Sequence, residues 1–260
     1  MVFATDLDRT IIYSKRFIEK YTPAVMPVEV HLGKEIAYMT KKAVENLKRI
    51  SKLIDIIPVT TRNIGEYHRV ALFKEIHPRY CIMNNGATIY VDGNEDEEWT
   101  KQVRKKIGSM NVGYNDIITQ FVKKAKMEHV KVYRLSDDFL WVIVVYEELF
   151  DFSVLEQFKE YAKERGWNVV ATGKKVYLIP CFINKWNALQ HICNKYEVDT
   201  VIAAGDSLLD YEMVINAAMG IVPRHGELAG FLNGRGIITQ KSGIEAGEEI
   251  LEIVASSISA

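Results

Sequence analysis

Cysteine is scarce in this chain, neither sign of charge is in excess, and long apolar runs are absent. The cysteines, Cys81, Cys181 and Cys193, are scattered without a C-x-x-C pair, which argues against a disulfide framework or a thiolate zinc site and fits a reducing compartment. The 33 Lys and Arg residues nearly balance the 34 Asp and Glu residues, and the formal net charge is −1. No global field therefore favours nucleic acid or an anionic membrane, so any recognition of phosphate must be local.

Membrane and export signals are also missing. The longest apolar run, residues 139–146, is too short to cross a bilayer, and no basic and apolar signal pattern precedes Asp6. We therefore expect a cytoplasmic protein with no membrane or nucleic acid partner. The length of 260 residues suits one core domain plus a smaller domain.

Two carboxylates, Asp6 and Asp8, end the first predicted strand, residues 2–7. Alternate residues of a strand share a face, so these acids would project together. Such a pair is costly without a cation. A hard divalent ion such as Mg²⁺ would remove the repulsion, leaving one carboxylate to attack phosphorus and the other to handle protons. Taken alone, a solvated strand-end turn explains the pair equally well.

Polar side chains follow two further apolar runs. The run at residues 54–59 leads into Thr60, Thr61 and Arg62, and the run at residues 201–204 leads into a glycine turn that carries Asp206, Ser207 and Asp210. Between them, Lys185 begins a helical pattern. Open α/β sheets bind ligands at strand ends. Each signal is weak singly, but together and in this order they indicate one site.

In these motifs the chain resembles the haloacid dehalogenase superfamily, specifically the Cof-type and sucrose-phosphatase-like phosphatases with a large inserted cap. The resemblance rests on Asp6-Leu7-Asp8-Arg9-Thr10, Thr60, Lys185, and Gly205-Asp206 with Asp210, and on Asn85-Gly86-Ala87, which matches the entry into the cap. It spans the core, while the cap matches only by position and element order.

The resemblance implies a site with divided roles. Asp6 would be the nucleophile and Asp8 the general acid and base, while Mg²⁺ would be held by Asp6, the Asp8 carbonyl and Asp206. Lys185 and Thr60 would hold the transferring oxygens, and Asp210, beside Ser207, would orient Lys185 or a metal-bound water. Further phosphate or substrate contacts would come from Arg9, Thr10, Thr61, Arg62 and Asn85.

The order of elements predicts an α/β fold with a Rossmann-like parallel sheet and an inserted α+β cap. A strand at 2–7, a helix at 34–53, a strand at 54–59, a helix at 65–76 and a strand at 80–84 form βα units. Residues 88–180 then break the alternation with helices at 98–107, 115–127 and 152–165 and two hairpins, and βα alternation resumes after residue 181. We therefore expect a core at 1–87 and 181–260 and a cap at 88–180.

Two positions depart from the family pattern. Arg9 stands where these phosphatases usually carry Gly, and Leu209 stands where an Asn commonly precedes the last Asp. Arg9 could replace the missing donor or grip a second anionic group on the substrate. It could equally pair with an acid at the cap hinge or point to water.

We expect a Mg²⁺-dependent phosphatase that acts on a small phosphorylated metabolite, such as a sugar phosphate, through an aspartyl-phosphate intermediate. A phosphomutase shares the paired aspartates and the cap, and a non-catalytic sensor of a phosphorylated ligand is a third alternative. Residues of the cap that could contact substrate are Arg134, Lys174 and Lys175.

Overall fold

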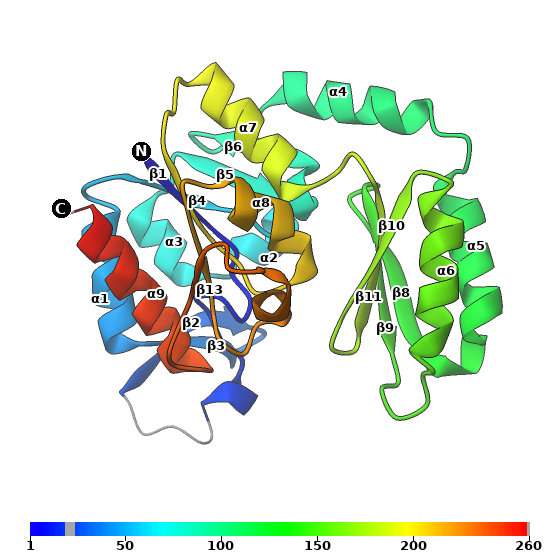
Figure 1. The fold of residues 1–260 in the computed structure, drawn as a ribbon, viewed down its shortest axis with the longest axis horizontal. Coiled ribbons are helices and arrows are strands. Elements are labelled where there is room, and N and C mark those ends of the chain that lie inside the picture. Colours follow the sequence, from blue (N-terminus) through cyan, green and yellow to red (C-terminus); the bar gives the residue numbers. More distant parts are fainter. Residues whose placement is uncertain (19–23, 259–260) are drawn as a thin grey trace. The chain divides into compact units, whose positions relative to one another are not determined.

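The computed structural model describes residues 1–18 and 24–258. The chain forms two compact units (Figure 1): unit 1 comprises residues 1–96 and 185–260, and unit 2 comprises residues 97–184. The predicted insertion spans residues 88–180, so unit 2 begins nine residues later and ends four residues later than predicted. The predicted fold class, a parallel-sheet core with an inserted α+β domain, is confirmed.

The centre of unit 1 is a parallel sheet with the strand order β14-β13-β12-β1-β4 among the described residues. Its strands are β1 (Val2–Thr5), β4 (Asp55–Pro58), β12 (Val201–Ala204), β13 (Met219–Val222) and β14 (Ile237–Ile238). Thr5 lies between Ala204 of β12 and Pro58 of β4 in the parallel register. The central strand β1 is fully buried, as expected for an apolar run covered on both faces.

Helices cover both faces of this sheet. Helices α1 (Lys41–Ile50) and α9 (Ile244–Ser257) pack together on one face, and α7 (Lys185–Lys195) and α8 (Tyr211–Asn216) pack together on the other (Figure 1). The core between the sheet and the first pair is built from side chains at helical spacing, such as Leu47 and Leu251. Short 3₁₀ segments complete the connections at Lys15–Phe17, Leu208–Asp210 and Glu227–Phe231.

The predicted helix at 34–53 is wrong in its first third. Residues Val25–His31 (β2) and Lys34–Thr40 (β3) form an antiparallel hairpin, and α1 begins only at Lys41. Thr40 is the N-cap of α1, because its hydroxyl accepts a hydrogen bond from the amide of Ala43 at 3.0 Å. Ile36 and Met39 fit the helical spacing of α1 by chance, which extended the predicted helix backward through the strand.

A small antiparallel sheet adjoins the chain directly after β4. It contains β5 (Tyr80–Met83), β6 (Thr88–Val91) and β7 (Asn94–Glu95), and the amide of Thr60 donates to the carbonyl of Ile82 at 2.9 Å. Between β4 and β5 lie α2 (Ile64–Tyr67) and α3 (Ala71–Ile76), and a 3₁₀ turn at Asn84–Gly86 connects β5 to β6. Since β6 pairs with β5 along its whole length, it belongs to unit 1 and not to the insertion.

Unit 2 has a four-stranded antiparallel sheet with the order β10-β11-β9-β8 among its described residues. The strands are β8 (Val130–Ser136), β9 (Leu140–Val145), β10 (Trp167–Thr172) and β11 (Lys175–Pro180). Helices α5 (Tyr114–Ala125) and α6 (Ser153–Lys163) pack on one face through a core that includes Phe121, Phe158 and Trp167. Helix α4 (Glu97–Gly108) opens the unit, and a 3₁₀ turn lies at Met127–His129. The three predicted helices and two predicted hairpins of the insertion are confirmed to within a few residues.

Candidate active site

The predicted site residues of unit 1 gather where the strand order of the central sheet reverses. From β1 the chain proceeds to β4 on one side, whereas β12 leads to β13 and β14 on the other. Loops after neighbouring strands on the two sides of such a point separate and leave a crevice at the carboxyl ends of the strands. Asp6 directly follows β1, and Asp206 follows β12 after one glycine. The topology therefore brings together two acids that are 200 residues apart in the sequence.

A buried lysine connects two of the acids. Lys185, at the first position of α7, places Nζ 2.6 Å from Oδ1 of Asp6 and 2.5 Å from Oδ1 of Asp210. The lysine is 1 % exposed and Asp210 is fully buried, so these charge-assisted bonds lie away from water. Thr10 donates its hydroxyl to Oδ2 of Asp6 at 3.2 Å.

Local structure fixes Asp210 against the turn that carries Asp206. The amide and hydroxyl of Ser207 donate to Oδ2 of Asp210 at 3.0 and 2.9 Å. Together these two bonds cap the 3₁₀ turn Leu208–Asp210. Gly205 has no side chain, and a Cβ there would lie 2.3 Å from Cβ of Asp210. The glycine turn is therefore required for Asp210 to reach Lys185.

Acidic side chains outnumber the lysine in this cluster, and the crowding shifts their pKa values. Burial raises the pKa of Asp6 to about 7, and burial together with Asp6 and Asp210 holds the pKa of Asp206 well above its usual value. Burial alone would lower the pKa of Lys185, but the carboxylates of Asp210 and Asp6 outweigh it and raise that pKa. One lysine thus faces three buried acids.

Arg9 supplies a second cation on the other side of Asp206. Its Nε lies 3.5 Å from Oδ2 of Asp206, which is an ion-pair distance and not a good hydrogen bond. The backbone of Arg9 has φ +66°, a conformation that glycine adopts most easily, which accounts for the glycine usual at this position in the resembling family. Arg9 thus pairs with an acid of the cluster itself and not with one at the cap hinge, and its predicted contact with substrate stays a prediction. Leu209 is half-buried in the 3₁₀ turn.

The donor set fits a hard divalent cation such as Mg²⁺. Carboxylate oxygens of Asp6, Asp206 and Asp210 lie within 4.8 Å of one another, and oxygen ligands are those that Mg²⁺ prefers. Oδ2 of Asp206 is buried and has no hydrogen-bond partner among the described residues. Both oxygens of Asp210 accept bonds from Lys185 or Ser207, so Asp6 and Asp206 are the acids better placed to hold a metal.

The loop after β4 borders the same strand ends. Thr60 is buried, and its carbonyl accepts from the amide of Asn85 at 2.9 Å. Asn85 has φ +58° and is also buried. Thr61, the residue after Thr60, is half-buried. The structure therefore places the predicted substrate contacts Thr60 and Asn85 in direct backbone contact.

Arg62 is engaged by two carboxylates. Its Nε and Nη2 donate to Oδ2 and Oδ1 of Asp8 at 2.8 and 2.7 Å, and its Nη1 lies 2.9 Å from the carboxylate of Glu29. Burial acts to lower the pKa of Arg62, but Asp8 and Glu29 outweigh it and raise that pKa. Arg62 is predicted from the sequence to contact substrate, and this stays a prediction; in the structure its guanidinium binds Asp8 and Glu29. Glu29, 2 % exposed on β2, was missed because the hairpin was not predicted.

Comparison with known families identifies the chain over most of its length. The sequence model of the sucrose-6F-phosphate phosphohydrolase family matches residues 1–227, which include every residue of the site described above. No curated protein sequence matches the chain closely enough to count as a relative.

Solved structures share the fold at low sequence identity. The sucrose-phosphatase of Synechocystis sp. PCC6803, solved with sucrose and phosphate, is 20 % identical with a TM-score of 0.70, over 98 % of this chain and 97 % of that one. A HAD/COF-like hydrolase of Plasmodium vivax is 13 % identical with a TM-score of 0.64, over 98 % and 95 %. A haloacid dehalogenase subclass IIB sugar phosphatase is 10 % identical with a TM-score of 0.66, over 99 % of both chains.

None of the helices in the described ranges has the length and apolar character needed to cross a bilayer. The family match spans Asp6, Asp8, Lys185 and the acidic turn at residues 205–210. The chain therefore belongs to the sucrose-6F-phosphate phosphohydrolase family and is a phosphatase of the haloacid dehalogenase superfamily.

Proposed function

We propose that the protein hydrolyses the phosphate monoester of a small sugar in a Mg²⁺-dependent reaction that passes through a phosphorylated Asp6. Sucrose 6F-phosphate is the first candidate substrate, since the matching family is defined by that activity. We place the reaction in the cytoplasm, where the free thiols of Cys81, Cys181 and Cys193 would stay reduced.

The buried cluster of Asp6, Lys185, Asp206 and Asp210 is the observation that carries the proposal. A carboxylate can attack phosphorus without first losing a proton, and Oδ2 of Asp6 has only the 3.2 Å bond from Thr10 among its described contacts. Lys185 binds Asp210 and also Oδ1 of Asp6. Its positive charge would also neutralise a phosphoryl oxygen.

The reaction has two balanced steps. In the first, a carboxylate oxygen of Asp6 bonds to phosphorus, the bond from phosphorus to the sugar oxygen breaks, and Asp8 gives its proton to that oxygen. In the second, Asp8 takes a proton from water as the water oxygen bonds to phosphorus, and the bond to Asp6 breaks to release phosphate. Both oxygens of Asp8 accept hydrogen bonds from Arg62, so one of these bonds would break when Asp8 is protonated, and the other would hold the carboxyl group in place.

Asp6, the backbone carbonyl of Asp8 and Asp206 would hold the Mg²⁺ ion, and Oδ2 of Asp206, which has no hydrogen-bond partner among the described residues, supports this assignment. When bound, the ion offsets the repulsion between the attacking carboxylate and the phosphate dianion. Thr60 and Asn85 would contact the phosphoryl group from the side of β4.

A substrate screen tests the proposed function. Phosphate release from sucrose 6F-phosphate, other phosphorylated sugars and p-nitrophenyl phosphate would be measured with Mg²⁺ and with EDTA. We expect Mg²⁺-dependent release, fastest with a sugar phosphate. Isomerisation of a sugar phosphate without free phosphate would instead identify a mutase, and no turnover of any monoester would reject the proposal.

Stabilisation of the protein by Mg²⁺ should grow with pH. The raised pKa values of Asp6, about 7, and Asp206 mean that the metal-free fold loses stability as pH rises from the usual aspartate range toward 7. Protons therefore occupy the carboxylates at low pH and compete with the ion. We expect saturating Mg²⁺ to raise Tm more at about pH 8 than at about pH 5.5, by several degrees. Thermal unfolding measures this, and Asp206→Asn should abolish the increase; an equal increase at both pH values would place the ion elsewhere.

Replacing Arg9 with glycine should tighten Mg²⁺ binding. The guanidinium lies 3.5 Å from the oxygen of Asp206 that would ligate the ion, so its charge competes with the metal. We expect Arg9→Gly to lower the half-saturating Mg²⁺ concentration about threefold to tenfold, as measured by titration of activity or Tm. Arg9→Lys keeps the charge and is the control. Weaker Mg²⁺ binding in Arg9→Gly would mean that Arg9 supports the site.

Unit 2 would serve as a cap that selects the substrate, and the structure separates its cationic candidates. Arg134 pairs with Val142 and Lys175 pairs with Val144 across the sheet, so both side chains share the face opposite the helices α5 and α6. Lys174 instead lies in the exposed hairpin turn.

Lys175→Gln should therefore raise KM for the sugar phosphate about fivefold, the effect of one charged hydrogen bond at a partly exposed site. Lys174→Gln, the matched neighbour, should leave KM within about twofold. Steady-state kinetics with the preferred sugar phosphate checks both values. Equal effects of the two substitutions would show that only net charge matters.

A further inference from the structure

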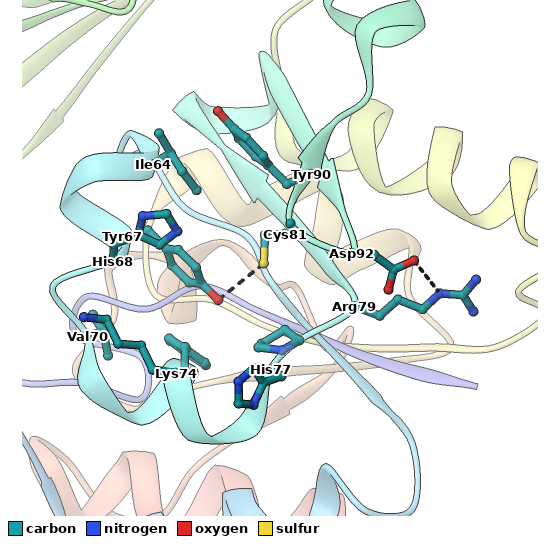
Figure 2. Close-up of a pocket in the computed structure, with 13 residues that line it drawn as sticks. Ile64, Tyr67, His68, Val70, Lys74, His77, Arg79, Cys81, Tyr90 and Asp92 are labelled. Atoms are coloured by element: carbon teal, nitrogen blue, oxygen red, sulfur yellow. Dashed lines mark hydrogen bonds and ion pairs between the residues drawn. The ribbon is translucent and has the colours of Figure 1, made fainter.

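A separate cavity of about 550 Å³ lies in unit 1 between α2, α3 and the strands β5 and β6 (Figure 2). The described residues that line it include neither Asp6 nor Lys185 nor Asp206. Its volume falls within the range of small-molecule sites. It is therefore a candidate ligand site distinct from the proposed reaction centre.

Two hydrogen-bonded polar side chains, Cys81 and Tyr67, lie inside the cavity, and one of their hydrogens has no acceptor among the described residues. Cys81 donates its thiol to the hydroxyl oxygen of Tyr67 at 3.3 Å, and the residues are 7 % and 5 % exposed. The hydroxyl hydrogen of Tyr67 then has no acceptor among the described residues. Burial raises the pKa of Cys81 to about 11 and also raises that of Tyr67, so both groups stay neutral. The interior thus offers one neutral hydrogen-bond donor to an acceptor oxygen.

The walls around this pair are mainly apolar. Ile64 and Val70 come from the segment of α2 and its following turn, and Tyr90 comes from β6 (Figure 2). Phe73 stacks on Tyr67 with ring centroids 5.2 Å apart. Such walls suit an apolar body, preferably an aromatic one.

The mouth of the cavity carries positive charge. Lys74, His77 and Arg79 are exposed lining residues. Asp92 is the acid there, and it lies 3.7 Å from Arg79, which it balances. Lys74 has no ion-pair partner within the described ranges. One anionic group on a ligand would therefore find a cation at the mouth.

From these observations we propose that the cavity is an effector site for a small aromatic carboxylate. The ring system fills the apolar interior, an acceptor oxygen takes the hydroxyl hydrogen of Tyr67, and the carboxylate lies beside Lys74.

The elements that line this cavity are continuous in the chain with residues of the proposed reaction site. Helix α2 begins after its N-cap Asn63, and the preceding residue, Arg62, binds Asp8. Ile82, next to Cys81, accepts the hydrogen bond from the amide of Thr60. A ligand that contacts Tyr67 and Cys81 would limit the movement of α2 and β5, and with them of Arg62 and Thr60. The phosphatase rate would change as a result.

The probe 4-benzoylbenzoate has an aromatic body, a ketone oxygen and one carboxylate, and benzophenone is its neutral counterpart. Calorimetry would measure the binding of each to the unaltered protein and to Lys74→Gln. Lys52→Gln is the control, because Lys52 is an exposed lysine of unit 1 that does not line the cavity. Irradiation of the bound ketone and peptide mapping would locate its adduct, and phosphate release from p-nitrophenyl phosphate would be followed with the probe at saturation.

We expect one saturable site, about threefold to fivefold weaker binding of the carboxylate to Lys74→Gln, unchanged benzophenone binding, and adducts within residues 64–93. We also expect a changed kcat in the parent. Absence of saturable binding, equal affinity in Lys74→Gln, or adducts outside these residues would overturn the site. Binding with an unchanged kcat would overturn its effector role. The binding measurements do not depend on the proposed reaction, so they stand even if no monoester is hydrolysed.

Discussion

Asp6→Asn should reduce turnover by several orders of magnitude, as expected for loss of a nucleophile. The amide is nearly the same size as the carboxylate but cannot attack phosphorus. Lys185 would keep its bond to Asp210, since that contact of 2.5 Å does not involve Asp6. The variant should therefore remain folded while kcat falls on every substrate.

Kinetics with the preferred sugar phosphate and with p-nitrophenyl phosphate would measure this loss. Asp8→Asn is the informative control, because an activated aryl leaving group needs little protonation. We expect Asp8→Asn to retain more activity on the aryl phosphate than on the sugar phosphate in the first step. Activity of Asp6→Asn within about tenfold of the parent would show that another residue attacks.

Lys185→Met should have the largest effect on stability. The substitution leaves Asp6 and Asp210 buried without their cation, and breaking a buried pair in this way costs about 3 to 5 kcal/mol. The cost should be smaller at about pH 5.5 than at about pH 8, since Asp6, whose raised pKa would rise further without the lysine, then takes up a proton. Catalysis should also be lost.

Denaturant unfolding of the metal-free protein at both pH values would measure this destabilisation. Lys48→Met on α1 is the matched control, because Lys48 is 42 % exposed and its partner Glu75 is 60 % exposed. We expect this control to lose about 1 kcal/mol or less. A similar loss in both variants would mean that Lys185 contributes no more than a surface lysine.

The sequence predicted the elements that carry strong periodic patterns. Strand ends place Asp6 and Asp206 at one edge of a parallel sheet whatever the details of the loops, so their meeting follows from topology alone. The helices of unit 2 were also predictable, because α5 and α6 each bury a regular apolar stripe, which includes Phe121 in α5 and Phe158 in α6.

Other features depend on contacts that no local pattern reveals. The hairpin of β2 and β3 was hidden because Ile36 and Met39 continue the helical spacing of α1, and Glu29 was lost with it. The ion pairs of Arg62 and Arg9 join residues distant in the sequence, and only the folded chain shows which acid each arginine meets. The predicted start of the insertion, residue 88, differs from the start of unit 2 at residue 97, because β6 turns back to pair with β5.

Covalent phosphorylation of Asp6 is the central claim, and trapping it is the most direct test. The Asp8→Asn variant, mixed with p-nitrophenyl phosphate and Mg²⁺, should form the phosphoenzyme but hydrolyse it slowly, because the base for the attacking water is gone. After an acid quench, mass spectrometry should find one phosphoryl group on the peptide that contains Asp6, and none in the double variant with Asp6→Asn. A phosphoryl group on another residue, or steady phosphate release with no phosphorylated Asp6 at any time, would contradict the account.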